Sequence, residues 1–129
     1  MKYGLGRVFM FRAPRGVDLL DYLREFASKE NIRAGLLSMV GLLVNPSIGY
    51  YNIEKGVYEE IKLEGVYELL HGSGSISLRE NKPFVHIYVA LADKDGKAYG
   101  GHLIKGEVYI AEIIIIEFTE ENQTKQENQ

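Results

Sequence analysis

The sequence has no cysteine, which excludes disulfide bonds and thiolate metal sites. This composition is compatible with a reducing cytoplasm, and we expect the protein to be cytoplasmic. No apolar stretch approaches the length needed to cross a bilayer, and the isoleucine run Ile113 to Ile116 falls far short of it. The apolar cluster Val8 to Phe11 is too short for a signal peptide. We therefore expect a soluble protein with no membrane partner.

Basic residues are not in excess. The 15 Lys and Arg residues against 18 Asp and Glu give a formal net charge of −3, and the basic residues are scattered. A protein that binds DNA by neutralising phosphates usually carries a basic stripe. Direct DNA binding is therefore disfavoured, unless self-association gathers basic residues of the N-terminal segment around one opening, namely Arg7, Arg12 and Arg15.

Two common motifs of catalysis and nucleotide binding are also missing. The chain has neither a G-x-x-x-x-G-K-[ST] phosphate loop nor a G-x-S-x-G nucleophile elbow. Ser73, Ser75 and Ser77 alternate along one strand face, with nothing beside them that indicates an activated nucleophile. We expect a protein that is not an enzyme.

The length and pattern predict one domain over residues 5–118, followed by a polar, disordered tail over 119–129 that has no apolar residue. One helix is predicted at about 17–31, where apolar residues recur at intervals of three and four. The remaining segments have strand character, with a turn at Asn45-Pro46 and a bend or bulge at Gly72 and Gly74. The predicted strands are 3–12, 34–43, 47–53, 57–63, 65–78, 83–92, 97–105 and 106–118.

The last predicted strand is apolar on both faces. Ile113 and Ile115 point to one side of the sheet, and Ile114 and Ile116 to the other. A single helix can cover only one of these sides. The other side must meet a second layer or another subunit, because large exposed apolar patches are rare on monomers. We therefore expect self-association, with a monomeric two-layer fold as the alternative.

Two of the three histidines are predicted to lie side by side. In strand 83–92, His86 and Tyr88 point away from the core-facing side chains. A three-residue loop with Gly96 in the left-handed conformation would place His102 opposite Tyr88. A two- or four-residue loop would send His102 to the other face. Gly100 and Gly101 indicate either a bulge or a close approach by a backbone or ligand.

This cluster allows three interpretations. The side chains could hydrogen-bond across a subunit contact, bind a small ligand or move protons, or hold a metal. Two histidines alone are too few for a zinc site, which usually takes three or four protein ligands. Glu68, His71 or a residue of a neighbouring subunit would have to complete the set.

Several segments together resemble the plant and prokaryote conserved (PPC) domain, which occurs alone in prokaryotes and beside AT-hook motifs in plants. The resemblance implies an α/β (α+β) fold with a mostly antiparallel sheet and one main helix, assembled as a homotrimer and, in plants, tied to transcriptional regulation. The R-G-R-P core of the AT-hook is absent here, and Val66 stands where the family typically has arginine. The matching segments are Gly41, Gly65-Val66-Tyr67-Glu68-Leu69-Leu70, Gly72-Ser73-Gly74-Ser75-Ile76, Lys82-Pro83-Phe84-Val85-His86, Asp95-Gly96 and Gly100-Gly101-His102-Leu103.

The fold is also expected to be similar to that of acetolactate decarboxylase, whose zinc is held by an H-x-H pair and a later histidine. The matching positions here are His86, Tyr88 and His102. Tyrosine is a poor zinc ligand at neutral pH because its phenol stays protonated. We therefore expect no cofactor, with zinc at His86 and His102 as the alternative.

Three functional hypotheses follow. The first is a non-catalytic trimeric assembly module linked to transcription regulation or to a DNA-associated partner. The second is a small-molecule-binding protein or metal-dependent enzyme with its site at a subunit interface. Its expected site residues are Glu68, His86, Tyr88, Gly100, Gly101 and His102. The third is direct DNA binding.

Overall fold

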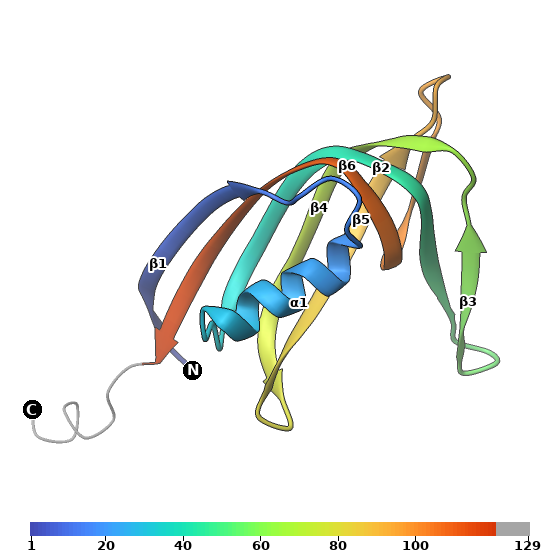
Figure 1. Cartoon of the computed structure of the whole chain (residues 1–129). Coiled ribbons are helices and arrows are strands. Elements are labelled where there is room, and N and C mark those ends of the chain that lie inside the picture. The colour runs from blue at the N-terminus through green and yellow to red at the C-terminus, as the bar shows by residue number, and fades with distance from the viewer. Residues whose placement is uncertain (121–129) are drawn as a thin grey trace, which may run out of the picture.

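The computed structural model describes residues 1–120, which form one helix and six strands (Figure 1). No described helix is long and apolar enough to span a membrane. The elements in chain order are β1 (Tyr3–Arg12), α1 (Leu19–Lys29), β2 (Gly35–Asn52), β3 (Val57–Lys62), β4 (Val66–Arg79), β5 (Lys82–Ala92) and β6 (Ala98–Glu120).

All strand pairings are antiparallel and belong to one strongly bent sheet. Strand β6 is long enough to pair with β1, β2 and β5, and β2 pairs with β3, β4 and β6. The pairings β2–β4–β5–β6–β2 therefore return to their starting strand. Strands β1 and β3 are the two edges, and α1 lies against the concave side of the sheet (Figure 1).

The helix lies within the predicted range 17–31 and begins after Asp18, which caps it. The Asp18 carboxylate accepts a hydrogen bond from the backbone N–H of Asp21, which satisfies one of the free donors of the first turn. Its other oxygen accepts from the N–H of Gly106 in β6, so the same side chain also ties the helix to the sheet. The apolar face of α1 is buried against the sheet through Leu19, Leu20, Leu23 and Ala27.

The core follows cross-strand rows, meaning residues that stand opposite one another on successive strands. One inward row joins Phe9, Ile115 and Leu37, and the next joins Phe11, Ile113 and Met39. Phe26 of α1 packs on this side, edge-on to Phe9 and stacked on Phe11 with ring centroids 4.3 Å apart. The prediction that Ile113 and Ile115 point to the same side of the sheet is thus confirmed, and that side is the core.

Two of the predicted strand boundaries are wrong. Segments 34–43 and 47–53 form one strand, β2, and segments 97–105 and 106–118 form one strand, β6. At Asn45-Pro46 the chain makes an irregularity within β2, because Asn45 adopts φ 48° and its side chain accepts a hydrogen bond from Gly65. Both strands bend at the same level, since the β2–β6 register shifts there, and the bend allows the sheet to curl.

The predicted bend at Gly72 and Gly74 is also misplaced. The bulge in β4 lies between Leu69 and His71, and the two glycines sit in regular pairing. A Cβ at Gly72 would come within 2.6 Å of Met39, so the site needs glycine for packing. At its C-terminal end, β6 includes residues 119 and 120, which pair with β1; the remainder of the predicted tail, residues 121–129, lies outside the described residues.

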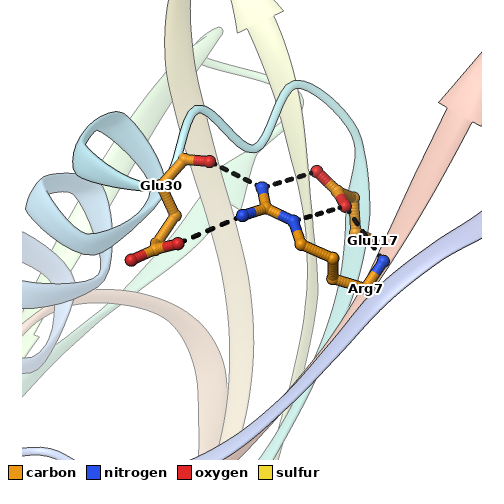
Figure 2. Close-up of polar contacts among 3 residues, drawn as sticks. All are labelled: Arg7, Glu30 and Glu117. Atoms are coloured by element: carbon orange, nitrogen blue, oxygen red, sulfur yellow. Dashed lines mark hydrogen bonds and ion pairs between the residues drawn. The ribbon is translucent and has the colours of Figure 1, made fainter.

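An ion-pair network fixes β1 to both β6 and the end of α1 (Figure 2). Arg7 donates two side-chain hydrogen bonds of 2.9 Å to the Glu117 carboxylate, and its backbone N–H donates a third. Its guanidinium also donates to the carboxylate and the carbonyl of Glu30, just beyond the helix. The hydrogen bonds that Arg7 donates to Glu117 lower the pKa of Glu117 from its ordinary 4.5 to about 2. Glu117 therefore stays charged in the folded protein.

This network predicts a pH-dependent stability difference between the protein and a Glu117→Gln variant. At pH 7 the free energy of unfolding of the variant, measured in urea, should be about 1–2 kcal/mol lower than that of the protein. The expected loss is no larger because Arg7 is half exposed and solvent screens the ion pair. Because the folded pKa is depressed, the contribution is complete above about pH 4.5 and disappears as the pH falls towards 2. The free energies of unfolding of the protein and of the Glu117→Gln variant should therefore become equal in acid. A difference that does not change with pH would contradict this assignment.

Candidate functional site

The side of the sheet that faces away from α1, here called the outer face, also consists of cross-strand rows. One row runs Val8, Ile116, Leu36, Ser75 and His86 across β1, β6, β2, β4 and β5. The adjacent row follows the same strands, and its members are Met10, Ile114, Ser38, Ser73 and Tyr88. Both rows change from apolar side chains on β1 to serines on β4 and to polar rings on β5.

The apolar end of the outer face is uncovered by the described chain. Met10 is 79% exposed and Val8 66%, and large side chains of the neighbouring strands are also exposed. A hollow of about 430 Å³ lies between β1, β2 and β6, and its lining includes Met10, Ser38, Val40 and Ile114. The exposed neighbours on β2 and β6 are Leu36, Val40, Ile110 and Ile114.

The polar end of the outer face has the predicted register. Asp93 and Lys97 close a three-residue loop in which Gly96 adopts φ 82°, and the Gly96 N–H donates to the Asp93 carbonyl. The Asp93 carboxylate accepts from the N–H groups of Asp95 and Lys97, which fixes the turn. His102 therefore stands opposite Tyr88. The prediction that His86, Tyr88 and His102 gather on one face is confirmed.

The rings of this cluster are in mutual contact. The His86 centroid lies 4.8 Å from those of Tyr88 and His102, and the Tyr88 and His102 centroids are 5.7 Å apart. Tyr58 of β3 adds a fourth ring, 5.6 Å from His102. Tyr58 could not be predicted as part of the cluster. It reaches His102 only because β2 bends and carries β3 towards β6, and no motif in the sequence indicates this bend.

His102 has an unusual environment among the described residues. Its Nδ1 atom is buried and has no hydrogen-bond partner within residues 1–120. Burial, and then the nearby His86, lower the pKa of His102 below its ordinary 6.5. The ring is therefore neutral at pH 7, and Nδ1 retains the capacity to bind a proton donor, a proton acceptor or a metal, depending on its tautomer.

The remaining predicted site residues lie elsewhere. Glu68 stands opposite Ala92 near the start of β4, and His71 lies 3.4 Å from the Ser38 hydroxyl. No group of three or more His, Asp or Glu side chains within residues 1–120 is arranged to hold a metal. The described chain thus offers two imidazoles and two phenols at one place, but no complete ligand set.

Gly100 and Gly101 allow close approach of the backbones of neighbouring strands. A Cβ at Gly101 would lie 2.7 Å from the carbonyl oxygen of Gly49 in β2, and one at Gly100 would lie 3.1 Å from that of Val89 in β5. At this level β6 passes from its pairing with β5 to its pairing with β2. The glycine pair therefore positions the neighbouring His102.

The neutral state of His102 gives a titration prediction. In an NMR pH titration, the His102 ring should have a midpoint below 6.5. Replacing His86 by glutamine removes the smaller cause of the shift, so the midpoint should rise but remain below 6.5, since burial is the larger cause. A midpoint that is unchanged in the variant, or that exceeds 6.5, would show that the environment of His102 is misassigned.

The chain is similar to proteins of known structure over nearly its whole length. It is 43% identical to a plant- and prokaryote-conserved protein of Pyrococcus horikoshii, with 94% of this chain and 85% of that chain covered and a TM-score of 0.91. It is 37% identical to a metal-containing protein of Archaeoglobus fulgidus, with 93% and 85% covered and a TM-score of 0.88.

A curated relative is much longer. The bifunctional protein GlmU of Synechococcus sp. (strain JA-3-3Ab) is 32% identical over 123 residues, which are 93% of this chain and 18% of that protein. The chain therefore spans less than a fifth of this relative.

More distant structures share the fold alone. One is a Staphylococcus aureus protein of unknown function similar to α-acetolactate decarboxylase, with 16% identity, 91% and 53% coverage and a TM-score of 0.60. Another, described as a candidate DNA-binding protein of Bacteroides thetaiotaomicron, has 17% identity, 93% and 86% coverage and a TM-score of 0.83. The expected resemblance to the acetolactate decarboxylase fold is thus confirmed. The sequence model of the Plants and Prokaryotes Conserved (PCC) domain matches residues 2–119, and the chain therefore belongs to this family.

Proposed function

We propose that the protein is a non-catalytic assembly module whose copies associate as a homotrimer through the outer face of the sheet. The observation that carries this proposal is the apolar end of that face. Its exposed side chains would lose contact with water on association, at about 25 cal/mol per Å² of apolar surface buried. The hollow between β1, β2 and β6 is suited to receive a side chain of a second copy.

The composition of the outer face also supports self-association. Next to its apolar rows, in the described chain, Arg12 of β1 stands opposite Glu112 of β6 and forms an ion pair with it at 2.8 Å. Because the two charges cancel, they would not repel the same surface of a second copy. The number three comes from the resemblance to the family. The scattered basic residues speak against direct contact with DNA, so a regulatory role would act through a DNA-associated protein partner.

The mass in solution tests this proposal. Light scattering coupled to size exclusion should give three times the 14.6 kDa chain mass at micromolar concentration, in low and in high salt, because apolar contacts are not screened. A flat mobility-shift titration with duplex DNA at low salt is expected in parallel. A stable species of 14.6 kDa would contradict the proposal.

A second candidate function is a metal or proton-transfer site at His86 and His102. It is favoured by the buried, unpartnered Nδ1 of His102 within the described chain and by the 4.8 Å separation of the two rings. The similar Archaeoglobus fulgidus protein is described as metal-containing. A divalent metal held by the two imidazoles would take a further ligand from water or from a neighbouring copy, and it would polarise a bound oxygen.

Elemental analysis of tag-free protein separates this candidate from the first. Stoichiometric metal that is lost in His102→Ala, while the oligomeric mass is unchanged, would support a metal site. Protein that binds no zinc on titration, with the NMR signals of the His102 ring unchanged when zinc is added, would eliminate the metal site. Metal content is read by elemental analysis and assembly by light scattering, so either proposal can fail while the other stands.

A further inference from the structure

A basic pocket lies away from the outer face, between the end of α1 and the turn that joins β4 to β5. These two segments lie at the same end of the sheet in Figure 1. The pocket measures about 300 Å³. Ser28, Asn31 and Arg33 line one side, and Asn81, Lys82 and Pro83 line the other.

The pocket has an excess of positive charge. Arg33 and Lys82 come from opposite walls, the other polar groups are a hydroxyl and two amides, and no lining residue of the described chain is acidic. The carboxylates nearest along the chain are Glu30, which pairs with Arg7, and Glu80 in the β4–β5 turn, which is not part of the lining. This lining could surround an anion with donors from both sides.

Arg33 differs from every other arginine of the sequence. Within residues 1–120 it has no ion pair, side-chain hydrogen bond or aromatic ring as a partner. The other five guanidiniums each have one. Their partners within the described chain are Glu117 and Glu30 for Arg7, Glu112 for Arg12, Tyr109 for Arg15, Asp21 for Arg24 and Phe84 for Arg79.

The walls are held by defined backbone geometry. Arg79 pairs with Lys82 across a two-residue turn, in which Glu80 and Asn81 have φ 53° and 64°. On the helix side, Asn31 has φ 53°, and its N–H donates to the Ser28 carbonyl. Three of the four non-glycine residues with positive φ in the described chain thus flank this pocket. The negative end of the helix, which would repel an anion, is offset by Arg7 on the Glu30 carbonyl.

We propose that this basic pocket binds a phosphate group, either as inorganic phosphate or as the phosphate of a small monoester. Arg33 supplies a planar pair of donors that fits two phosphate oxygens, and Lys82 supplies a second positive charge from the facing wall. The hydroxyl of Ser28 and the amides of Asn31 and Asn81 can donate to the remaining oxygens. This site is independent of the outer face and of the assembly proposed above.

The test is an NMR titration of the full chain with inorganic phosphate, glycerol 3-phosphate and glycerol at constant ionic strength. The two phosphates should cause saturable shifts at residues 28–33 and 78–83, and glycerol should cause none. Tighter binding of glycerol 3-phosphate would indicate a monoester, and equal or tighter binding of inorganic phosphate would indicate the free ion.

Three variants complete the test. Arg33→Gln and Lys82→Gln should each raise the Kd about tenfold, since each removes a charge-assisted contact. Arg24→Gln removes an arginine that lies outside the pocket and pairs with Asp21, and it should leave the Kd unchanged. Shifts that do not saturate, shifts spread over the whole surface, or an equal loss in Arg24→Gln would overturn the proposal.

Discussion

Replacing Met10 by glutamate is expected to convert the proposed homotrimer into single folded chains. Met10 lies at the apolar end of the outer face, 79% exposed in an isolated chain, beside Ile114 in the same cross-strand row. In an assembly that covers this face, each copy would bury an unpaired carboxylate, which costs several kcal/mol per contact. Light scattering should show the mass fall to 14.6 kDa.

The control for this variant is Ile53→Glu. Ile53 lies in the loop between β2 and β3, outside the outer face, and is 84% exposed. Like Met10→Glu, its replacement puts a negative charge in place of an exposed apolar side chain. The mass of Ile53→Glu should remain that of the assembled protein, and the circular dichroism of both variants should be unchanged. Assembly that survives in Met10→Glu would remove this end of the face from the interface.

Replacing Gly74 by alanine is expected to cause the largest loss of stability. A Cβ at Gly74 would lie far inside van der Waals contact of the His86 carbonyl oxygen on β5. A backbone oxygen in a paired strand cannot rotate away, so β4 and β5 would have to separate. The free energy of unfolding in urea should fall by about 3 kcal/mol or more, the upper range for overpacking. The ring contacts of His86 with Tyr88 and His102 should weaken as well.

Gly49→Ala is the matched control. Gly49 is likewise a glycine inside a paired strand, but its Cβ would make only ordinary contacts, 3.4 Å from side-chain atoms of Ile104 and Tyr58. Its replacement should change the free energy of unfolding by less than about 1 kcal/mol, because alanine also costs less chain entropy than glycine. If Gly74→Ala lost no more stability than Gly49→Ala, the tight β4–β5 approach would be refuted.

The parts of the site that depend on local signals could be predicted from the sequence. Strand alternation places His86 and Tyr88 on one face, and Gly96 sets the hairpin register that adds His102. Both signals act within a few residues of the turn. The two-sided apolar pattern of Ile113 to Ile116 likewise predicts one covered and one uncovered face, as the exposure of Ile114 shows.

The parts that depend on the bent sheet could not be predicted. A turn signal at Asn45-Pro46 is indistinguishable in sequence from an irregularity inside a long strand, so the sequence predicts two strands where β2 is one. As a consequence, the contact between Tyr58 and His102 could not be predicted from the sequence. Arg33 and Lys82 are brought together by the packing of α1 across the sheet, and no sequence pattern connects them.

The accessibility of position 10 tests the central claim most directly. Because the chain has no cysteine, Met10→Cys carries a single thiol whose labelling rate reports whether the outer face is covered. We predict that it reacts about tenfold or more slowly than the thiol of Ile53→Cys, and that adding Ile114→Glu restores fast labelling. Equal labelling rates of Met10→Cys and Ile53→Cys in the otherwise unaltered protein would contradict the claim that further copies cover this face.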